Sequence, residues 1–301
     1  ETGQIAPEPS RPAIPEKVKD MDETADFSRW RDGVVRLARK PKKARRAPYE
    51  WERKVNFERI EERFDAEEET FTLALLTLLA RQEDQMVAEV KRLVAAGDVK
   101  GMEHLVVKYQ EAYENEFVKR GKGLFDAGKD DVQKEHSLKD LVIPTAALAW
   151  VSASARNIAQ KQLNDLTFNA RQAVLSGVSK ELSEREVTAS VRTAFDDYAE
   201  RKIPISAALT VHKFYEEGRE WTAEEAGLAF ATWSAILDDA TCAFCERRDG
   251  MTIRTDDPDF TKYSPGEVHA NCRCLWVFRE NYTGEETWKP VSKSDQEEYY
   301  Q

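Results

Sequence analysis

The sequence predicts a mainly α-helical protein, with a body of long helices followed by a small C-terminal α+β module. Charged residues make up 34% of the 301 residues and there are only 13 glycines, a composition typical of long, solvated helices. From Val55 onward, apolar residues recur at spacings of three and four, the period of an amphipathic helix. Residues that favour β-structure cluster late in the chain, at 230–237, 251–254 and 274–278, and predict three short strands.

Residues 1–50 are expected to form a disordered or extended arm that carries a basic segment. Prolines and charged residues dominate residues 1–26, which contain few apolar anchors. Pro41 interrupts the basic segment and Pro48 follows it, so an extended chain is favoured over a continuous helix. In a chain of net charge −11, the segment has two interpretations: a contact for DNA or an acidic protein, or a solvated linker. Its positive residues are Arg36, Arg39, Lys40, Lys42, Lys43, Arg45 and Arg46.

Residues 51–135 are expected to form an N-terminal helical region. Gly97 is a stop signal for its first helix, and a second helix is expected to include Met102 to Phe117. The stretch 121–136 is rich in glycine, lysine and aspartate and is expected to be a loop that acts as a hinge between domains. The apolar positions of the first helix are Phe57, Ile60, Phe64, Phe71, Leu75, Leu78, Met86, Val90 and Leu93.

A second helical region is expected at residues 136–220. A long helix is predicted from Pro144 to about Ser176, where Gly177 ends it. Ser183 with Glu186 forms a capping box that begins the next helix. Pro204 begins a further helix that Gly218 is expected to close, and a capping box at Thr222 and Glu225 predicts another short helix before the first strand. The apolar positions of the long helix are Leu148, Val151, Ile158, Leu163, Leu166, Phe168 and Val174.

Residues 221–280 are expected to form a metal-binding module, because they contain all four cysteines and one of the four histidines. The pair Cys242 and Cys245 is followed, after 23 residues, by His269-Ala-Asn-Cys272-Arg-Cys274. Thiolates and imidazole hold zinc tetrahedrally, and this pattern supplies one ligand more than zinc needs. The preferred set is Cys242, Cys245, His269 and Cys272, with Cys274 as the substitute for either of the last two. One of Cys272 and Cys274 is expected to be a bystander unless a turn joins them, since residues two apart on a strand are separated by about 7 Å.

Two other interpretations of the cysteines stay open. Disulfides are typical of small secreted domains, and no signal peptide is recognised in the sequence. A redox-active Cys-x-x-Cys is expected within a βαβ pattern, which the surrounding sequence does not show. Structural zinc is preferred, because a module of about 50 residues cannot easily bury enough apolar surface to fold alone. Zinc ligation contributes on the order of 10 kcal/mol of folding free energy to such modules.

Further residues accompany the cysteines and His269 at characteristic places in the sequence. They are Trp233, Asp238 or Asp239, Thr241, Asp249, Gly250, Pro265, Asn271 and Arg273. Together they resemble the C-terminal signature of the phage Mu F-like minor head proteins, a family of tailed-phage head-morphogenesis proteins. The final His-x-Asn-Cys-Arg-Cys is the most distinctive part of the resemblance. The stretch 145–218 also looks like the helical half of that family.

The resemblance implies a structural and assembly protein of the phage head, made in the bacterial cytoplasm and carried in the virion. It further implies a minor head protein inside the capsid near the portal, with portal or major capsid proteins as partners. Packaged DNA is an implied associate, and no catalytic residue is implied. The sequence contains no apolar run of 18 residues, so no membrane segment is expected.

Two alternative functions are retained. The first is a zinc-dependent nuclease or hydrolase in which Asp238, Asp239 or Asp249 acts as general base. It is disfavoured because several thiolate ligands would close the coordination shell and dampen the Lewis acidity of the metal. The second is the delivery module of a phage-encoded effector. Such an effector carries a separate toxic domain, and residues 279–301, which include the C-terminal tail at 281–301, are too short to be one.

Overall fold

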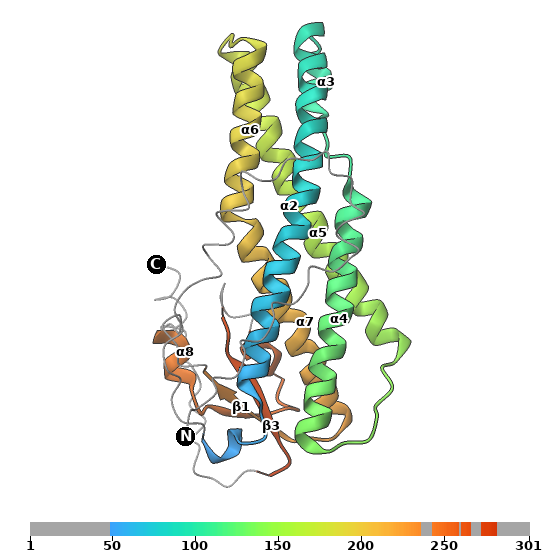
Figure 1. The fold of residues 1–301 in the computed structure, drawn as a ribbon, viewed down its shortest axis with the longest axis vertical. Coiled ribbons are helices and arrows are strands. Elements are labelled where there is room, and N and C mark those ends of the chain that lie inside the picture. Colours follow the sequence, from blue (N-terminus) through green and yellow to red (C-terminus); the bar gives the residue numbers. More distant parts are fainter. Residues whose placement is uncertain (1–48, 236–242, 259, 266–271, 282–301) are drawn as a thin grey trace, which may run out of the picture.

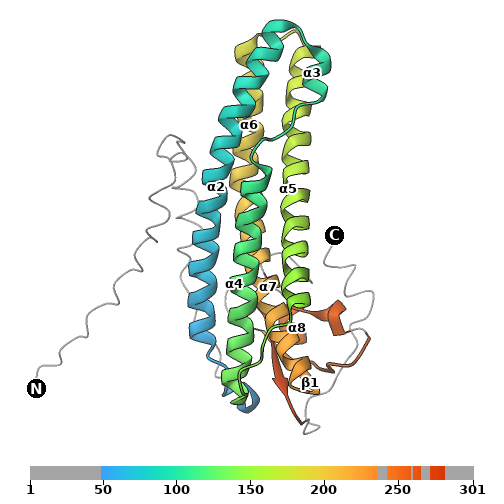
Figure 2. The ribbon, with the colours of Figure 1, turned by 90° about the vertical axis from the view of Figure 1, so that its right-hand side faces the viewer.

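The computed structural model describes residues 49–235, 243–258, 260–265 and 272–281. Five helices (α2, α4, α5, α6 and α7) run along its long axis, and the strands and α8 gather at one end (Figures 1 and 2). The longer helices are α2 (Phe57–Ala96), α4 (Gln110–His136), α5 (Thr145–Ser179), α6 (Glu184–Arg201) and α7 (Ile203–Glu225). The shorter elements are η2 (Glu50–Glu52), α3 (Val99–Glu103), β1 (Phe230–Ser234), α8 (Ala243–Arg248), β2 (Thr252–Arg254), η3 (Phe260–Tyr263) and β3 (Leu275–Arg279). The expected fold class, a body of long helices with a small C-terminal α+β module, is confirmed.

Helix α2 forms where the spacing of apolar residues predicts it. The Asn56 side chain caps its first turn by accepting a hydrogen bond from the backbone N–H of Arg59. Gly97 follows the last turn in the left-handed conformation, at φ 64°, which confirms the predicted stop. All nine apolar positions predicted for this helix are buried. None of the helices in the described part of the chain combines the length and hydropathy of a membrane span.

The expected hinge at 121–136 is wrong, because α4 is a continuous helix through this stretch. Its glycines allow a close approach to α7 rather than a bend. A Cβ at Gly128 would overlap the carbonyl oxygen of Tyr215, and one at Gly218 would overlap the carbonyl oxygen of Phe125. For the same reason Gly218 does not close a helix but lies inside α7. At these two glycines the backbones of α4 and α7 come into direct contact, in addition to the side-chain packing between the two helices.

Other expected helix boundaries also differ from those observed. The helix predicted over 102–117 is divided into α3 and α4, and α5 continues past Gly177 to Ser179. Thr222 opens no new helix, because its hydroxyl donates to the carbonyl of Gly218 within α7. The capping box of Ser183 and Glu186 is confirmed at the start of α6. Phe168, expected among the apolar positions of α5, is 58% exposed.

The sheet is antiparallel, with strand order β2-β1-β3. Gly250, at φ 83°, makes the turn into β2 that the Asp-Gly pair predicts. Successive side chains of β3 point to opposite faces of the sheet. Leu275 and Val277 belong to the core of the helical body, whereas Trp276 and Phe278 belong to a second core with the cysteines. The strand thus joins the helical body to the small module.

Candidate metal centre

Three cysteines from two separate segments meet in the small module. Cys245 lies on α8, while Cys272 and Cys274 lie in the non-strand residues just before β3. Their sulfur atoms are all within 4.8 Å of one another, and the three residues are 2%, 2% and 3% exposed. Because Cys272 and Cys274 precede the strand instead of lying in it, they are not held apart by extended geometry. The structure therefore brings Cys274 into the same cluster as Cys245 and Cys272.

The spacing of these sulfurs suits a tetrahedral metal better than a disulfide. The Sγ atoms of Cys245 and Cys272 are 3.8 Å apart, and the three cysteines are unbridged. A tetrahedral zinc with Zn–S bonds of about 2.3 Å has S···S edges of about 3.8 Å. A disulfide requires about 2.05 Å. Burial raises the pKa of the Cys274 thiol well above its ordinary value, so without a cation this thiol stays protonated. A bound divalent metal would favour the thiolates instead.

Several predicted site residues lie outside the described residues. They are Cys242 and His269, Asp238 and Asp239, and the basic residues Arg36, Arg39, Lys40, Lys42, Lys43, Arg45 and Arg46. Asp249, the third acidic candidate for a general base, is described. Its Oδ1 accepts a 2.8 Å hydrogen bond from the backbone N–H of Ala235, just beyond the end of β1. This contact suits a carboxylate that fixes the turn next to the sheet.

Aromatic residues of the sheet and its surroundings share a buried core with the cysteines. Trp233 on β1 and Trp276 on β3 are register partners, and their rings meet edge to face at 5.4 Å. Phe260 stacks on Trp276 at 5.5 Å, and Phe244 lies in the same core. Rings of this size contribute much of the apolar area that a small module can bury. The cysteines therefore lie in an apolar environment of low effective dielectric.

Arg273, between two of the cysteines, ties this segment to helix α2. Its Nη2 is 3.2 Å from Asp65 Oδ1 and 3.7 Å from Glu68 Oε2. Burial raises the pKa of Glu68 to about 7, although the Arg273 guanidinium acts in the opposite direction. The arginine of the Cys-Arg-Cys motif thus contacts helix α2, which comes from the N-terminal half of the sequence.

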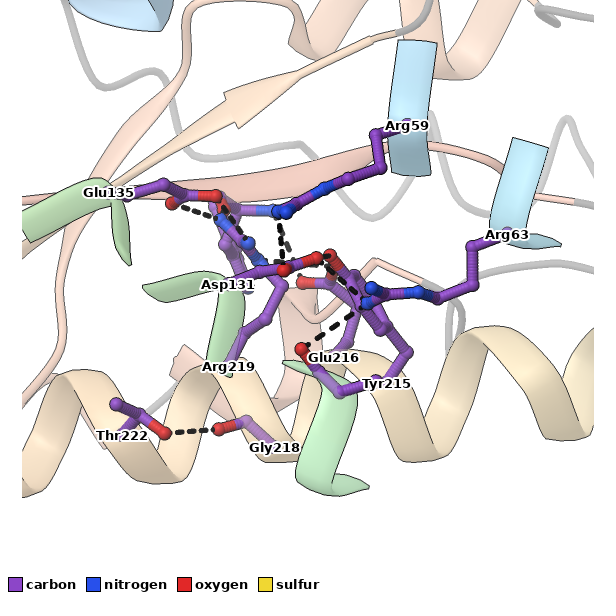
Figure 3. Close-up of polar contacts among 11 residues, drawn as sticks. Arg59, Arg63, Asp131, Glu135, Tyr215, Glu216, Gly218, Arg219 and Thr222 are labelled. Atoms are coloured by element: carbon purple, nitrogen blue, oxygen red, sulfur yellow. Dashed lines mark hydrogen bonds and ion pairs between the residues drawn. The ribbon is translucent and has the colours of Figure 1, made fainter. Parts of the chain in front are cut away.

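A second connection uses buried charges on α7 (Figure 3). Arg219 forms a two-pronged ion pair with Glu135 of α4, at 2.8 and 2.9 Å, and also donates to the carbonyl oxygen of Trp276 at 3.0 Å. Glu216 accepts a 3.3 Å hydrogen bond from the backbone N–H of Trp276. Trp276 lies on an edge strand of the sheet, so these side chains satisfy backbone groups that no neighbouring strand pairs. The helical body therefore completes the sheet.

The same network extends to α2 through Asp131 (Figure 3). The buried carboxylate of Asp131 accepts hydrogen bonds from Arg59 at 2.5 Å, Arg63 at 2.9 Å and the Tyr215 hydroxyl at 2.7 Å. Burial raises the pKa of Tyr215 well above its ordinary value, so the hydroxyl remains a donor. Helices α2, α4 and α7 are thereby fixed together at the end that carries the sheet.

Arg248, the last residue of α8, lies beside the cysteine cluster. It is 2% exposed, and its guanidinium carbon is 3.9 Å from the Phe244 ring centroid, 5.2 Å from that of Trp233 and 5.5 Å from that of Tyr263. Its Nε and Nη1 atoms are buried and have no hydrogen-bond partner in the described part of the chain. Burial lowers the pKa of this arginine, and the three cysteines and Tyr263 act against that change.

The roles of the arginines that connect these parts are not apparent from the sequence. Arg219 and Arg248 have no special local pattern, since buried and exposed arginines look alike in a charged sequence. Arg273 was visible as part of the Cys-Arg-Cys motif, but its partners are about 200 residues away. Their roles depend on tertiary contacts that only the fold provides.

The comparisons with known proteins give one match. Residues 164–277 match the sequence model of the family described as Phage Mu protein F like protein. No curated protein and no solved structure shows significant similarity to the chain. The matched segment starts within α5, includes α6, α7, β1, β2 and all four cysteines, and ends within β3. The resemblance inferred from the sequence is confirmed: residues 164–277 of this chain match the phage Mu protein F-like family model.

Proposed function

We propose that this protein is a phage head-morphogenesis protein with a structural role in assembly. The match of residues 164–277 to the phage Mu protein F-like family carries this proposal. The rigid junction between the helical body and the small module supports it, because a long helical surface with a fixed end is suited to docking on other proteins. Minor head proteins of this kind are expected inside the capsid near the portal, with portal or major capsid proteins as partners.

Within this role, the small module holds one structural zinc ion. Cys245, Cys272 and Cys274 supply three ligands, and Cys242 or His269 completes the tetrahedron. The distance between the sulfurs of Cys245 and Cys272 and the burial of all three thiols support this ligand set. Zinc would cross-link α8 to the segment before β3 and so fix two chain segments that the short strands alone hold weakly.

The basic segment at 36–46 is proposed to contact packaged DNA or an acidic surface of another head protein. Seven positive charges in an acidic chain support a local contact rather than general attraction to nucleic acid. The density of basic residues in this segment supports this part of the proposal.

A structural role is favoured over hydrolysis. The three described thiols are 2–3% exposed, so a metal held by them would not be within reach of a phosphodiester or peptide substrate. Asp249, which the hydrolase alternative needs as a free base, is engaged with the backbone of Ala235. Delivery of an effector has no specific support in the described residues.

The proposal is tested by fractionating particles of the phage or prophage that encodes the chain. Purified procapsids and mature heads are digested and measured by quantitative mass spectrometry. The protein is expected in both, at far fewer copies than the major capsid protein. Its absence from both, together with recovery from the unassembled fraction of the same lysate, would overturn the proposal. Deletion of the gene is expected to reduce the yield of DNA-filled heads, with restoration by a plasmid copy as control.

A further inference from the structure

The buried cation Arg248 forms no ion pair with a carboxylate in the described part of the chain. Its Nε and Nη1 make no hydrogen bond there, and the residue is 2% exposed. Isolated buried charges cost several kcal/mol, which proteins ordinarily offset with an ion pair. The Phe244, Trp233 and Tyr263 rings provide cation–π contacts, which attract a cation but carry no net negative charge. The rings therefore hold the guanidinium without neutralising it.

The cysteine cluster supplies the missing charge once a metal is bound. Zinc held by three thiolates and one neutral imidazole has a net charge of about −1, and four thiolates give about −2. An anionic complex of this kind is costly in an apolar core unless a cation lies nearby. Arg248 lies about one turn after Cys245 among the buried residues of α8, and the Trp233 and Phe244 rings that it contacts share a core with Cys245, Cys272 and Cys274.

We propose that Arg248 is a positioning residue that neutralises a negatively charged zinc–thiolate centre, held in place by the rings of Phe244, Trp233 and Tyr263. This inference rests on the proposed zinc site and deepens it. It requires at least three thiolate ligands, because two thiolates and two imidazoles would give a neutral complex that needs no counter-charge. It also accounts for a fully buried arginine at the end of a six-residue helix.

The test measures zinc affinity of the full-length protein by competition with a chromogenic chelator at fixed pH. Arg248→Met removes the charge but keeps an apolar side chain of similar length, and is expected to weaken zinc binding about 10–100-fold. Arg248→Lys keeps the charge and is expected to stay within a few-fold of the wild type. Arg247→Met removes the same charge from the exposed neighbouring position and is the matched control, with unchanged affinity expected.

The outcomes separate this inference from the proposed zinc site. If the wild type binds no zinc, both fail. If the wild type binds zinc and Arg248→Met binds it equally well, the role of Arg248 is wrong and the site stands. Equal losses in Arg248→Met and Arg248→Lys would show that shape rather than charge matters, which also overturns the inference. Should Arg248→Met fail to fold by circular dichroism, Arg248→Gln replaces it, with the same 10–100-fold loss expected.

Discussion

At the scale of single residues, arginines join the metal-binding module to the helices. Arg273 contacts Asp65 and Glu68 on α2, and Arg219 contacts Glu135 on α4 and the backbone of Trp276 on β3. Both use planar guanidinium groups that can serve two acceptors at once. The Arg219–Glu135 pair is buried, and removing one partner of a buried pair costs about 3–5 kcal/mol, because the remaining charge is left uncompensated. These contacts therefore fix the module in one orientation on the bundle.

Glu68 gives a pH dependence that can be measured. Its folded-state pKa of about 7 is above the ordinary 4.5, because burial disfavours the charged carboxylate. The protonated carboxyl therefore contributes stability that is complete below pH 4.5 and lost as the pH rises to about 7. Glu68→Gln is neutral at every pH. Relative to the wild type, its free energy of unfolding is expected to rise by about 1–3 kcal/mol between pH 5 and pH 8.

The measurement is urea unfolding of both proteins at several pH values. Comparing the two cancels the titration of all other groups. Glu69→Gln, at the exposed neighbouring position, controls for the loss of one negative charge from α2. A difference between wild type and Glu68→Gln that stays constant from pH 5 to pH 8 would contradict the raised pKa of Glu68.

At the scale of elements, the close contact between α4 and α7 depends on two glycines. A Cβ at Gly218 would overlap the carbonyl oxygen of Phe125, and backbone cannot move aside as a side chain can. Gly218→Ala is therefore expected to lower the free energy of unfolding by at least about 2 kcal/mol. Thermal unfolding followed by circular dichroism measures this loss.

Gly123→Ala is the matched control within α4. A Cβ at Gly123 meets no atom within 4 Å, and the position is exposed. Alanine favours the helix over glycine, so this variant is expected to gain about 0.5–1 kcal/mol. Equal stabilities of Gly218→Ala and Gly123→Ala would contradict the packing of α4 against α7.

The same glycines show which elements sequence reasoning can predict. Helix ends with local signals were predicted well: Gly97 closes α2, and the capping box of Ser183 begins α6. Gly121, Gly128 and Gly218 carry the same local signal as Gly97 but lie inside helices. A glycine that ends a helix and one that admits a neighbouring backbone are indistinguishable until the neighbour is known. The expected hinge and the expected end of α7 failed for this reason.

The candidate site was predictable to a similar extent. The cysteines were evident from residue type and spacing, and the structure brings Cys245, Cys272 and Cys274 together. Whether Cys274 can join the cluster depends on the residue at which β3 begins, and the spacing of the cysteines along the sequence does not determine that residue. The strands predicted at 230–237, 251–254 and 274–278 are confirmed, with their ends within three residues of those expected.

At the scale of the whole molecule, the family-matched segment and the preceding helices share one core. Phe64 of α2 packs against Tyr215 of α7 edge to face at 4.9 Å, and α4 carries Glu135, the ion-pair partner of Arg219. Both α2 and α4 precede residue 164, where the match begins. The segment that matches the phage Mu protein F-like family is therefore covered by helices from outside the match, and the sheet is held by groups from both parts.

The thiol cluster lies in the small module, at the end of the molecule where Arg219 connects the sheet to the helices. Zinc content therefore tests the proposed centre most directly. The full-length protein, purified without chelators and supplied with equimolar zinc, is analysed by native mass spectrometry and by elemental analysis. About one zinc per chain is expected for the wild type, and a marked loss is expected for Cys245→Ser and for Cys274→Ser. A wild type without zinc, or variants that keep the full zinc content, would contradict the metal centre proposed for this domain.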